Sequence, residues 1–540
     1  MRNEGPEVLV AGAGPVGLAA AYELTRRGVR VRVVDRADGP ATTSRATATH
    51  ARTLEIYHQM GILGDLLPRG QRAENFTMHR NGRVLARLGT DYSTLPTRFP
   101  FTLQVDQVIT EEVLRERLHS RGVPVEWGVA LEDIDRRADG AAAWLRRADG
   151  SVEEQVVPWL IGADGAHSTV RARLGFELLG ESTETWLVAD AVLDADLPRD
   201  SLHWLHTGDG TLLLVPFPDH GKWRLLDTVD VDSDDPDVVA ARFARKISRA
   251  LGRPVEVCTP SWLSVFTIQQ RMIQRMRAGR CFVAGDAAHV HSPASGQGMN
   301  TGIQDAVNLA WKLADVIRGH AGEALLDSYA AERVPVGEVL LGTTKTATAL
   351  IALRNAAAPV LLPLGLGVLN AVRPLKHRVE RKIMRTMSGL ALSYPDSPLS
   401  LPGAARGTGY RQGDRVGCSE RAHESSAGWR ALCTELTDPR WTLLGFGAGN
   451  RAALEHIDRR YGAAVSVRTV MESTVDYEGP WPLADPGDVL RDAFGARDGE
   501  FALIRPDGYL AGTGPLGDGR DAESCLRAIH LLPKEHSPAR

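Results

Sequence analysis

The sequence predicts an α/β fold with more than one domain, and three observations support this prediction. A short apolar run at residues 8–11 is followed by a glycine-rich turn and an alanine-rich segment with helical spacing to about residue 27. The apolar run at 29–34 completes a strand–helix–strand unit of about 30 residues. Between about 176 and 275, alternating apolar residues interrupted by Pro, Gly and Asp indicate antiparallel strands.

The composition bounds the size of the protein and its partners. With 540 residues the chain exceeds one ordinary hydrophobic core, so two or three domains are expected. Its formal charge of -4, from 63 Lys and Arg against 67 Asp and Glu, provides no basic excess for nucleic acid. No CxxC pair occurs among the five cysteines, which favours reduced thiols and a cytoplasmic location.

The N-terminus and one apolar stretch bear on targeting. Charged residues after Met1 lead directly into the first strand, so no signal peptide is expected. Residues 347–372 are rich in Ala, Leu and Val, but Arg354, Pro359 and Pro363 interrupt them. A membrane helix needs about 20 apolar residues without such breaks. This stretch is therefore predicted to be a buried or groove-lining helix, and no membrane partner is expected.

The first glycine-rich turn is typical of a dinucleotide site. Residues 12–17 read Gly-Ala-Gly-Pro-Val-Gly and lie between the first strand and the first helix. The first glycine permits a tight turn, the second lets the backbone approach a pyrophosphate, and the third allows close helix–strand packing. Asp35, which closes the second strand beside Arg36, can accept hydrogen bonds from both ribose hydroxyls of an adenosine. These residues do not distinguish NAD from FAD.

Two later segments carry a family resemblance. Residues 162–171 read Gly-Ala-Asp-Gly-Ala-His-Ser-Thr-Val-Arg. Residues 285–289 read Gly-Asp-Ala-Ala-His, and the segment continues through Pro293 to Gly-Gln-Gly-Met-Asn-Thr-Gly at 296–302. With these motifs the chain resembles the class A flavoprotein monooxygenases, the para-hydroxybenzoate hydroxylase and phenol hydroxylase family. Within that family it looks most like the polyketide-tailoring aromatic hydroxylases of actinomycetes, strongly over about 1–340 and more weakly beyond.

The resemblance implies an order of domains. A Rossmann-like FAD-binding domain would be interleaved with an antiparallel-sheet substrate domain. A helical connector and a thioredoxin-like C-terminal domain would follow; because the latter lacks CxxC, a structural or oligomerisation role is expected. The predicted ranges are 1–75, 102–178 and 276–345 for the FAD domain, 76–101 and 179–275 for the substrate domain, 346–398 for the connector and 399–540 for the last domain.

The resemblance also assigns residues to FAD. Asp286 would bond the ribityl hydroxyls, and the glycine-rich segment 296–302 would stabilise negative charge on the reduced ring. Arg45 and Pro293 would flank the flavin and the oxygen pocket, and they are the two positions assigned to catalysis. Gln107 would contact the cofactor, with Gln104 as a rival. The predicted cofactor-binding residues are Gly12, Gly14, Pro15, Val16, Gly17, Asp35, Arg36, Arg45, Gln107, Asp164, Gly165, Asp286, Pro293, Gly296, Gly298, Met299 and Asn300.

The activity that the resemblance implies is aromatic hydroxylation. In the family NAD(P)H reduces FAD, O2 forms a flavin C4a-hydroperoxide, and an electron-rich ring takes up its terminal oxygen. We expect NADPH as the favoured reductant and a bulky polyketide-type or phenolic substrate, acted on by a monomer or homodimer in antibiotic biosynthesis. Two alternatives stay open on the same scaffold, namely a Baeyer–Villiger or epoxidising monooxygenase and a drug-inactivating resistance flavoprotein.

No conventional acid or base is identified in the sequence. His203, His206 and Tyr92 lie in the expected substrate domain, and each is more often a surface or core residue than a catalytic one. The spacing of His289 and His291 suggests a metal site, but no acidic or cysteine partner accompanies them, so no metal is expected. A structural ion pair is expected between Arg52 and Glu55. Aromatics that are either core or cavity lining are Trp186, Trp204, Phe217, Trp223 and Phe266.

Overall fold

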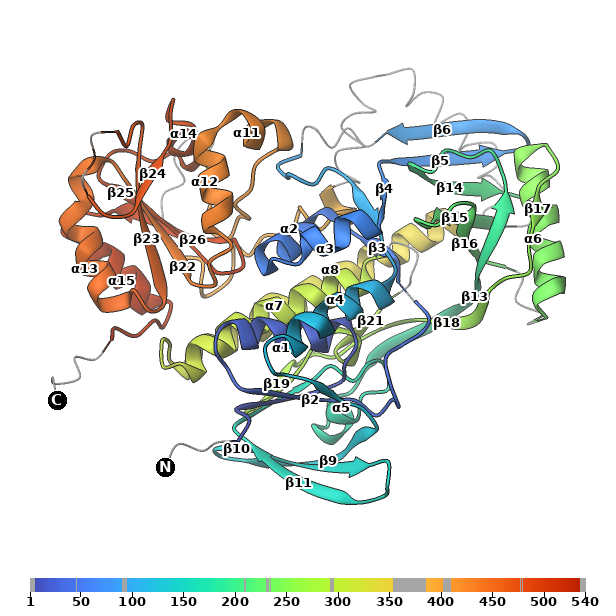
Figure 1. Cartoon of the computed structure of the whole chain (residues 1–540), viewed down its shortest axis with the longest axis horizontal. Coiled ribbons are helices and arrows are strands. Elements are labelled where there is room, and N and C mark those ends of the chain that lie inside the picture. Colours follow the sequence, from blue (N-terminus) through green and yellow to red (C-terminus); the bar gives the residue numbers. More distant parts are fainter. Residues whose placement is uncertain are drawn as a thin grey trace.

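The computed structural model has three regions along its long axis (Figure 1). One holds a parallel sheet with its helices, the second a large antiparallel sheet, and the third a smaller sheet formed by the C-terminal part of the chain. The structure describes residues 5–44, 46–89, 95–207, 210–229, 233, 235–291, 296–352, 385–401, 409–475, 477 and 479–534.

The parallel sheet contains the predicted strand–helix–strand unit. Its six strands run in the order β19-β20-β12-β1-β2-β8, and all neighbours are parallel except the pair β19 and β20. Apolar strands that are completely buried fit a sheet covered on both faces. The strands are β1 (Val8–Ala11), β2 (Val31–Val34), β8 (Val125–Glu126), β12 (Trp159–Gly162), β19 (Arg277–Ala278) and β20 (Cys281–Val283).

Helices cover one face of this sheet, and a small antiparallel sheet lies at the other (Figure 1). Alanines and glycines on the first helix let a second long helix pack closely against it. The helices are α1 (Pro15–Arg26), α4 (Gln107–His119) and α7 (Gly298–Ile317), all close to their predicted bounds. The small sheet consists of β9 (Val129–Arg137), β10 (Gly140–Arg147) and β11 (Val152–Val157), with α5 (Thr169–Arg173) nearby.

The large sheet contains the strands predicted between 176 and 275, together with a hairpin from much earlier in the chain. Its order is β21-β18-β13-β16-β15-β14-β5-β6, with β17 also paired to β13. Neighbours are antiparallel except β14 and β5, which join the two sequence regions in parallel. The strands are β5 (Asn75–Arg80), β6 (Arg83–Gly89), β13 (Leu179–Asp194), β14 (Ser201–His206), β15 (Thr211–Pro216), β16 (Lys222–Asp227), β17 (Glu256–Val257), β18 (Trp262–Met272) and β21 (His289–Val290).

A helix that the sequence analysis did not predict, α6 (Pro236–Leu251), packs on one face of this sheet. Asp235 caps its first turn by accepting hydrogen bonds from the backbone N–H groups of Asp237 and Val238. Phe243 and Ile247 are completely buried against leucines of the sheet. The opposite face carries a second apolar cluster that includes Trp186, Val188, Leu213, Val215 and Leu226.

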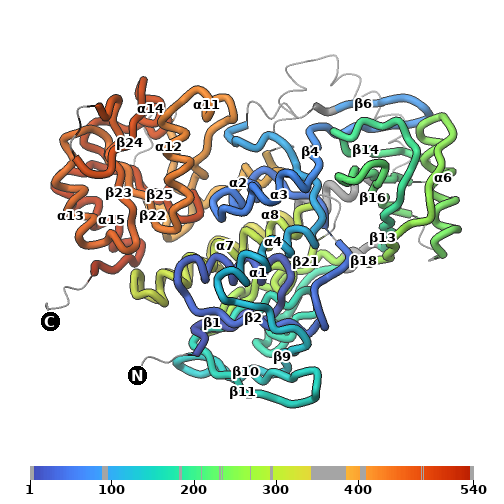
Figure 2. The backbone as a smooth tube through the Cα atoms, in the orientation of Figure 1, coloured from blue at the N-terminus to red at the C-terminus, as the bar shows by residue number. Residues whose placement is uncertain are grey.

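Short elements connect the first two regions, and the long helix that follows α7 runs between them. Figure 2 shows the chain pass from the parallel sheet to β5 and β6 and return before the large sheet is completed. The connecting elements are α2 (Ala51–Met60), α3 (Leu63–Leu66), η1 (Leu67–Arg69) and a sheet of β3 (Ala48–Thr49), β7 (Thr102–Gln104) and β4 (Gln71–Ala73). After α7, η5 (Glu323–Leu326) leads into α8 (Asp327–Ala352).

The C-terminal region has its own sheet, in the order β24-β23-β22-β25-β26. It packs on α7, where the rings of Trp311 and Trp441 meet edge to face with centroids 5.2 Å apart. Its strands are β22 (Trp441–Phe446), β23 (Val465–Met471), β24 (Pro482–Ala484), β25 (Glu500–Ile504) and β26 (Leu510–Pro515). Its helices are α11 (Glu420–Ser425), α12 (Ala427–Glu435), η6 (Ala448–Asn450), α13 (Arg451–Tyr461), α14 (Val489–Phe494) and α15 (Arg520–Ala528).

Among the described helices, none combines the length and hydrophobicity that crossing a membrane would require. Most of the apolar stretch at 347–372 lies outside the described residues, so its predicted helix is seen only as far as Ala352.

Candidate functional site

The glycines of the first turn differ in what surrounds them. A Cβ on Gly12, whose φ is +107°, would lie 2.3 Å from the carbonyl oxygen of Ala163. A Cβ on Gly17 would lie 1.9 Å from the carbonyl oxygen of Gly12. By contrast, a Cβ on Gly14 would meet no protein atom within 4 Å. The protein itself therefore requires the first and third glycines, whereas Gly14 borders open space at the start of α1, where Pro15 and Val16 follow.

Asp35 braces this turn. Its carboxylate accepts hydrogen bonds from the backbone N–H of Ala13 at 2.6 Å and of Ala37 at 2.8 Å. A carboxylate has about four acceptor positions, so capacity for ribose hydroxyls is left. Arg36 is exposed next to it. Open space at Gly14, free N–H groups at the helix start and a fixed carboxylate suit the pyrophosphate and adenosine of FAD.

Arg45 lies outside the described residues, but both of its neighbours are held. The carbonyl oxygen of Ser44 accepts a hydrogen bond from the Arg224 guanidinium at 2.7 Å, and the N–H of Ala46 donates to Gln107 Oε1 at 3.3 Å. Gln107 thus supports the segment that carries Arg45. Its rival Gln104 is completely buried, and neither of its amide atoms has a partner within the described part of the chain.

The side chain of Asp164 stabilises the turn of the second motif. Its carboxylate accepts hydrogen bonds from Ser168 Oγ at 2.5 Å and from the N–H of Val170 at 3.1 Å, which fixes the turn into α5. Gly165 adopts a φ of +79°, and a Cβ there would meet no protein atom within 4 Å. The side chain of Asp164 therefore bonds its own turn, and Gly165 leaves space beside it.

The third motif packs directly on the first. A Cβ on Gly285 would lie 2.8 Å from Val16 Cγ2, and one on Gly302 would lie 2.6 Å from the same atom. Gly285 has a φ of +63° and begins the short turn η3 (Gly285–Ala287), on which Asp286 is exposed. The glycines of the third motif and the start of α1 are therefore brought together, as a shared dinucleotide site requires. Pro293 lies outside the described residues.

Asn300, which was predicted to lie beside the flavin ring, is held in place by backbone groups. Its Oδ1 accepts a hydrogen bond from the N–H of His50 at 2.9 Å, and its Nδ2 donates to the carbonyl oxygens of Ala48 and Gly296. The side chain thus joins β3 to the glycine-rich segment. Met299 is buried, and no protein atom would touch a Cβ on Gly298 within 4 Å.

The expectation that His289 has no acidic partner is wrong. Its Nε2 lies 2.5 Å from Asp305 Oδ2, and His291 Nε2 lies 2.8 Å from His289 Nδ1. Asp305 lies 16 residues further along the chain, on α7, and only the fold brings its carboxylate to the histidine ring. It is also paired with Arg333, and the part of the chain that the structure describes holds no group of three or more residues able to bind a metal.

The other candidate residues of the large sheet are mostly packed. Trp186, Phe217 and Trp223 are buried, whereas Trp204 and Phe266 are half-buried at the apolar cluster opposite α6. His203 is completely buried, with His79 Nε2 at 2.9 Å from its Nδ1, and His206 bonds Thr211. Tyr92 lies outside the described residues. The predicted ion pair of Arg52 with Glu55 is confirmed at 3.0 Å.

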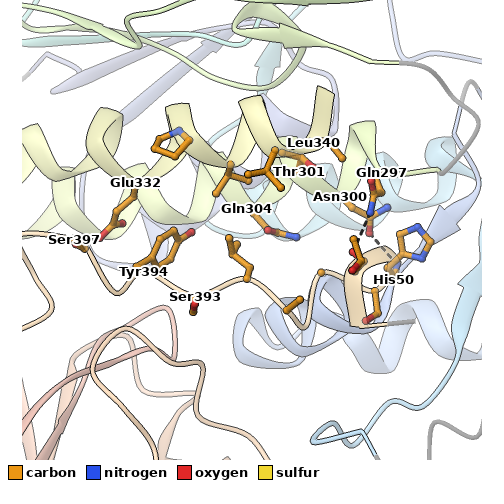
Figure 3. Close-up of a pocket in the computed structure, with 18 of the residues that line it drawn as sticks. His50, Gln297, Asn300, Thr301, Gln304, Glu332, Leu340, Ser393, Tyr394 and Ser397 are labelled. Atoms are coloured by element: carbon orange, nitrogen blue, oxygen red, sulfur yellow. Dashed lines mark hydrogen bonds between the residues drawn. The ribbon is translucent and has the colours of Figure 1, made fainter. Parts of the chain in front are cut away.

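A cavity of about 330 Å³ adjoins the glycine-rich segment (Figure 3). It lies between α7, α8 and residues 385–397. One end is formed by His50, Gln297 and Asn300, the other by Glu332, Tyr394 and Ser397, and Gln304 lies between the two ends. Its apolar lining is provided mainly by Pro335, Val336, Val339, Leu340, Met387 and Leu392.

Buried charges close the far end of this cavity. Glu332, which is completely buried, accepts hydrogen bonds from Arg505 at 2.6 Å and from Lys312 at 2.7 Å. Burial alone would raise the pKa of Glu332, but the charges of Arg505 and Lys312 hold it well below its usual range. Burial lowers the pKa of Lys312 to about 8, although Glu332 opposes this. Arg505 comes from β25 and its turn, so the C-terminal region completes the cavity's surroundings.

Comparisons with known proteins agree with this geometry. A family model described as FAD binding domain matches residues 6–344. The chain is 59% identical to 6-methylpretetramide 4-monooxygenase of Streptomyces rimosus over 536 residues, which are 99% of this chain and 95% of that enzyme. It is 31% identical to pentachlorophenol 4-monooxygenase of Sphingobium chlorophenolicum, with 95% and 94% of the two chains covered.

Among solved structures, the anhydrotetracycline hydroxylase OxyS from Streptomyces rimosus superimposes with a TM-score of 0.75 at 29% identity, covering 98% of this chain and 99% of that one. The mixed α/β fold predicted from the sequence is therefore confirmed.

Proposed function

Since the chain belongs to the family of FAD-dependent aromatic monooxygenases, as the sequence resemblance predicted, we propose that it hydroxylates a tetracyclic polyketide of the 6-methylpretetramide type. The observation that carries this proposal is the cavity beside the glycine-rich segment. Its volume of about 330 Å³ lies at the lower end of the range of about 300–1,000 Å³ that holds drug-sized ligands. An apolar lining with the Gln304 amide between its ends suits a flat, fused-ring compound that carries polar groups.

The described residues fit FAD, and their roles follow from their positions. The start of α1 with Gly14 would hold the pyrophosphate, Asp35 the adenosine ribose, and Asp286 the ribityl chain. When bound, FAD would supply the redox chemistry: reduced nicotinamide, for which we propose NADPH, would provide a hydride, and one atom of O2 would enter the ring while the other leaves as water. Gln107 and Asn300 support the two segments on either side.

We also propose the domain order that the resemblance implied. The FAD-binding domain would comprise 1–75, 102–178 and 276–345, and the interleaved substrate domain 76–101 and 179–275. The parallel pairing of β14 with β5 supports this interleaving, because it joins strands from both substrate segments. Residues 399–540 would be a thioredoxin-like domain without CxxC, and the enzyme a cytoplasmic monomer or homodimer.

The test is NADPH oxidation by FAD-loaded protein with 6-methylpretetramide, anhydrotetracycline and pentachlorophenol, followed by mass spectrometry of products. We expect 6-methylpretetramide to accelerate oxidation most and to gain one oxygen atom as a hydroxyl on the ring. No acceleration by 6-methylpretetramide, or oxygen inserted as an ester, would contradict the proposal.

A variant pair tests the cavity. Val336→Trp fills the apolar part of the cavity, so the KM for 6-methylpretetramide should rise at least about tenfold, which corresponds to about 1.4 kcal/mol of lost binding. Val152→Trp, at a 49% exposed position on β11, is the matched control and should leave KM unchanged. An unchanged KM in Val336→Trp would place the substrate elsewhere.

A further inference from the structure

Gln304 presents an amide to the middle of the cavity (Figure 3). It lies on α7 one helical turn beyond Asn300, which corresponds to about 6 Å at 1.5 Å per residue. Gly389 of the facing segment leaves room for it, because a Cβ there would lie 3.3 Å from Gln304 Nε2. Within the part of the chain that the structure describes, this amide forms no hydrogen bond. Its acceptor oxygen and its donor hydrogens are therefore available to a molecule in the cavity.

Tyr394, at the far end of the cavity, has an unused donor. Its hydroxyl oxygen accepts a hydrogen bond from Arg333 Nη1 at 2.8 Å. Because a guanidinium can only donate, the hydroxyl hydrogen needs another acceptor, and the described residues provide none. Burial raises the pKa of Tyr394 well above its usual value, although the charge of Arg333 opposes this, so the hydroxyl keeps its proton at neutral pH. A buried O–H without an acceptor costs free energy, and an acceptor on a bound molecule would remove that cost.

Arg333 holds the Tyr394 hydroxyl beside the part of α7 that carries Gln304. Its Nη2 donates to the carbonyl oxygen of Thr301 at 3.2 Å, and its Nε donates to Asp305 at 2.6 Å. These two α7 residues lie on either side of Gln304 in the sequence. The two available groups of the cavity are therefore near the same turn of one helix.

The polar side chains that close the two ends of the cavity are already used by the protein. Asn300 forms hydrogen bonds with three backbone groups through its amide oxygen and nitrogen. The Glu332 carboxylate accepts hydrogen bonds from four side chains, namely Asn308, Lys312, Ser397 and Arg505. Gln304 and Tyr394 differ from these two residues because they keep hydrogen-bonding capacity for a ligand.

We infer that Gln304 and Tyr394 are specificity-determining residues that bind a carbonyl and a ring hydroxyl on one edge of the polycyclic substrate. This inference rests on the proposed function. Tyr394 donates its hydroxyl hydrogen to the carbonyl oxygen, and Gln304 Oε1 accepts the hydrogen of the ring hydroxyl. Both contacts lie beyond Asn300, so the ring to be hydroxylated lies at the end formed by His50 and Asn300, next to the glycine-rich segment.

The shape of the cavity makes such contacts decisive for the site of hydroxylation. The residues of α8 that line it extend from Glu332 to Leu340, about 12 Å along the helix. Burial of apolar surface is non-directional, so an apolar wall of this length does not by itself select one orientation of a flat ring system. Two hydrogen bonds on one edge do select one, and the same ring carbon then faces the glycine-rich end in every turnover.

The test uses FAD-loaded protein with 6-methylpretetramide, and its main variant is Gln304→Met. This change keeps the length of the side chain and removes no described hydrogen bond of the free protein, so it reports on the ligand contact. The Kd for 6-methylpretetramide should rise about 3–10-fold, which corresponds to about 0.7–1.4 kcal/mol, and a second product hydroxylated at another carbon should appear in NMR spectra. The Kd for FAD and the urea midpoint should stay as in the wild type. Gln155→Met, at a half-buried position on β11 outside the cavity, is the matched control and should change neither substrate Kd nor product.

A second variant, Tyr394→Phe, tests the other contact. It should raise the Kd for 6-methylpretetramide to a similar extent and also yield the second product. Because it leaves Arg333 without an acceptor, its urea midpoint should fall as well. Tyr461→Phe is its control, since it removes a buried hydroxyl that bonds Glu523 in the C-terminal region, and it should leave substrate Kd and product unchanged.

The outcomes distinguish this inference from the proposed function. A wild-type Kd for 6-methylpretetramide and a single product in Gln304→Met would overturn the inference, while hydroxylation by the wild type would leave the function standing. Changes confined to Tyr394→Phe would show a structural effect through Arg333, which also overturns the inference. If the wild type binds the compound without hydroxylating it, the proposed function fails, and a raised Kd in both variants still supports the two contacts.

Discussion

Gly14 and Gly17 belong to one motif, yet alanine at each position should weaken FAD binding for a different reason. At Gly14 the backbone has φ −74° and ψ −179°, which any residue adopts, and a Cβ would meet no protein atom within 4 Å. Gly14→Ala should therefore change the stability of the FAD-free protein by less than about 1 kcal/mol. The new methyl group instead enters the space proposed for the pyrophosphate. Loss of one N–H bond to a charged phosphate costs about 1.5–3 kcal/mol, or roughly 10–100-fold in the FAD dissociation constant.

Gly17→Ala should damage the protein before any cofactor binds. Its Cβ would lie 1.9 Å from the carbonyl oxygen of Gly12 and 3.3 Å from Ala163 Cβ, so α1 must move away from β1 and β12. Forcing an extra methyl group into such packing costs about 1–3 kcal/mol. We expect this loss in the FAD-free protein, with weaker FAD binding as its consequence.

Two measurements check the pair. Urea unfolding of FAD-free protein, followed by tryptophan fluorescence, gives the stability of each variant, and titration with FAD followed by flavin fluorescence gives the affinity. The reasoning is refuted if Gly14→Ala binds FAD as the wild type does, or if it destabilises the FAD-free protein as much as Gly17→Ala.

Two further predictions concern buried charge. Glu332→Gln should lower the free energy of unfolding by about 3–5 kcal/mol in urea, because Arg505 and Lys312 lose their buried counter-charge, whereas Glu154→Gln in an exposed pair should cost less than about 1 kcal/mol. Equal effects in the two variants would contradict this. Burial, together with the charge of His203, lowers the pKa of His79 to about 4, so the unfolded chain takes up this proton near pH 6.5 and the folded protein only near pH 4. The stability that neutral His79 contributes is complete above about pH 6.5 and is lost as the pH falls towards 4. His79→Gln should therefore flatten the fall of the urea midpoint between pH 7 and pH 5, and an unchanged slope would count against it.

The parts of the fold that were predictable are those that local sequence encodes. The strand–helix–strand unit and α7 followed from apolar periodicity, and the glycine motif followed from its place between them. Helix α6 was missed because strands dominate the surrounding residues. The Asp-Pro pair at 235–236 was a usable start signal, since Asp235 caps the helix and Pro236 occupies its first turn.

The candidate site was predictable in position but less so in chemistry. The motif predicted that Asn300 lies beside the flavin, but it gave no sign that the side chain bonds Ala48 and His50, which lie about 250 residues earlier in the chain. Similarly, Asp305 lies 16 residues after His289, and only the fold shows that its carboxylate bonds the His289 ring. A side chain's partner depends on tertiary contacts, and one sequence contains no record of these.

Buried ion pairs join the C-terminal region to α8 beside the cavity. Arg505 bonds Glu332 with both guanidinium nitrogens and also bonds Asp507, all of them buried. Removing one partner of such a pair leaves an uncompensated charge in the interior, at a cost of about 3–5 kcal/mol. Separating this region from α8 would incur that free-energy cost, so the buried pairs favour one fixed arrangement of the C-terminal region and α8. Because Glu332 also closes one end of the cavity, the C-terminal region fixes the shape of that end without lining it.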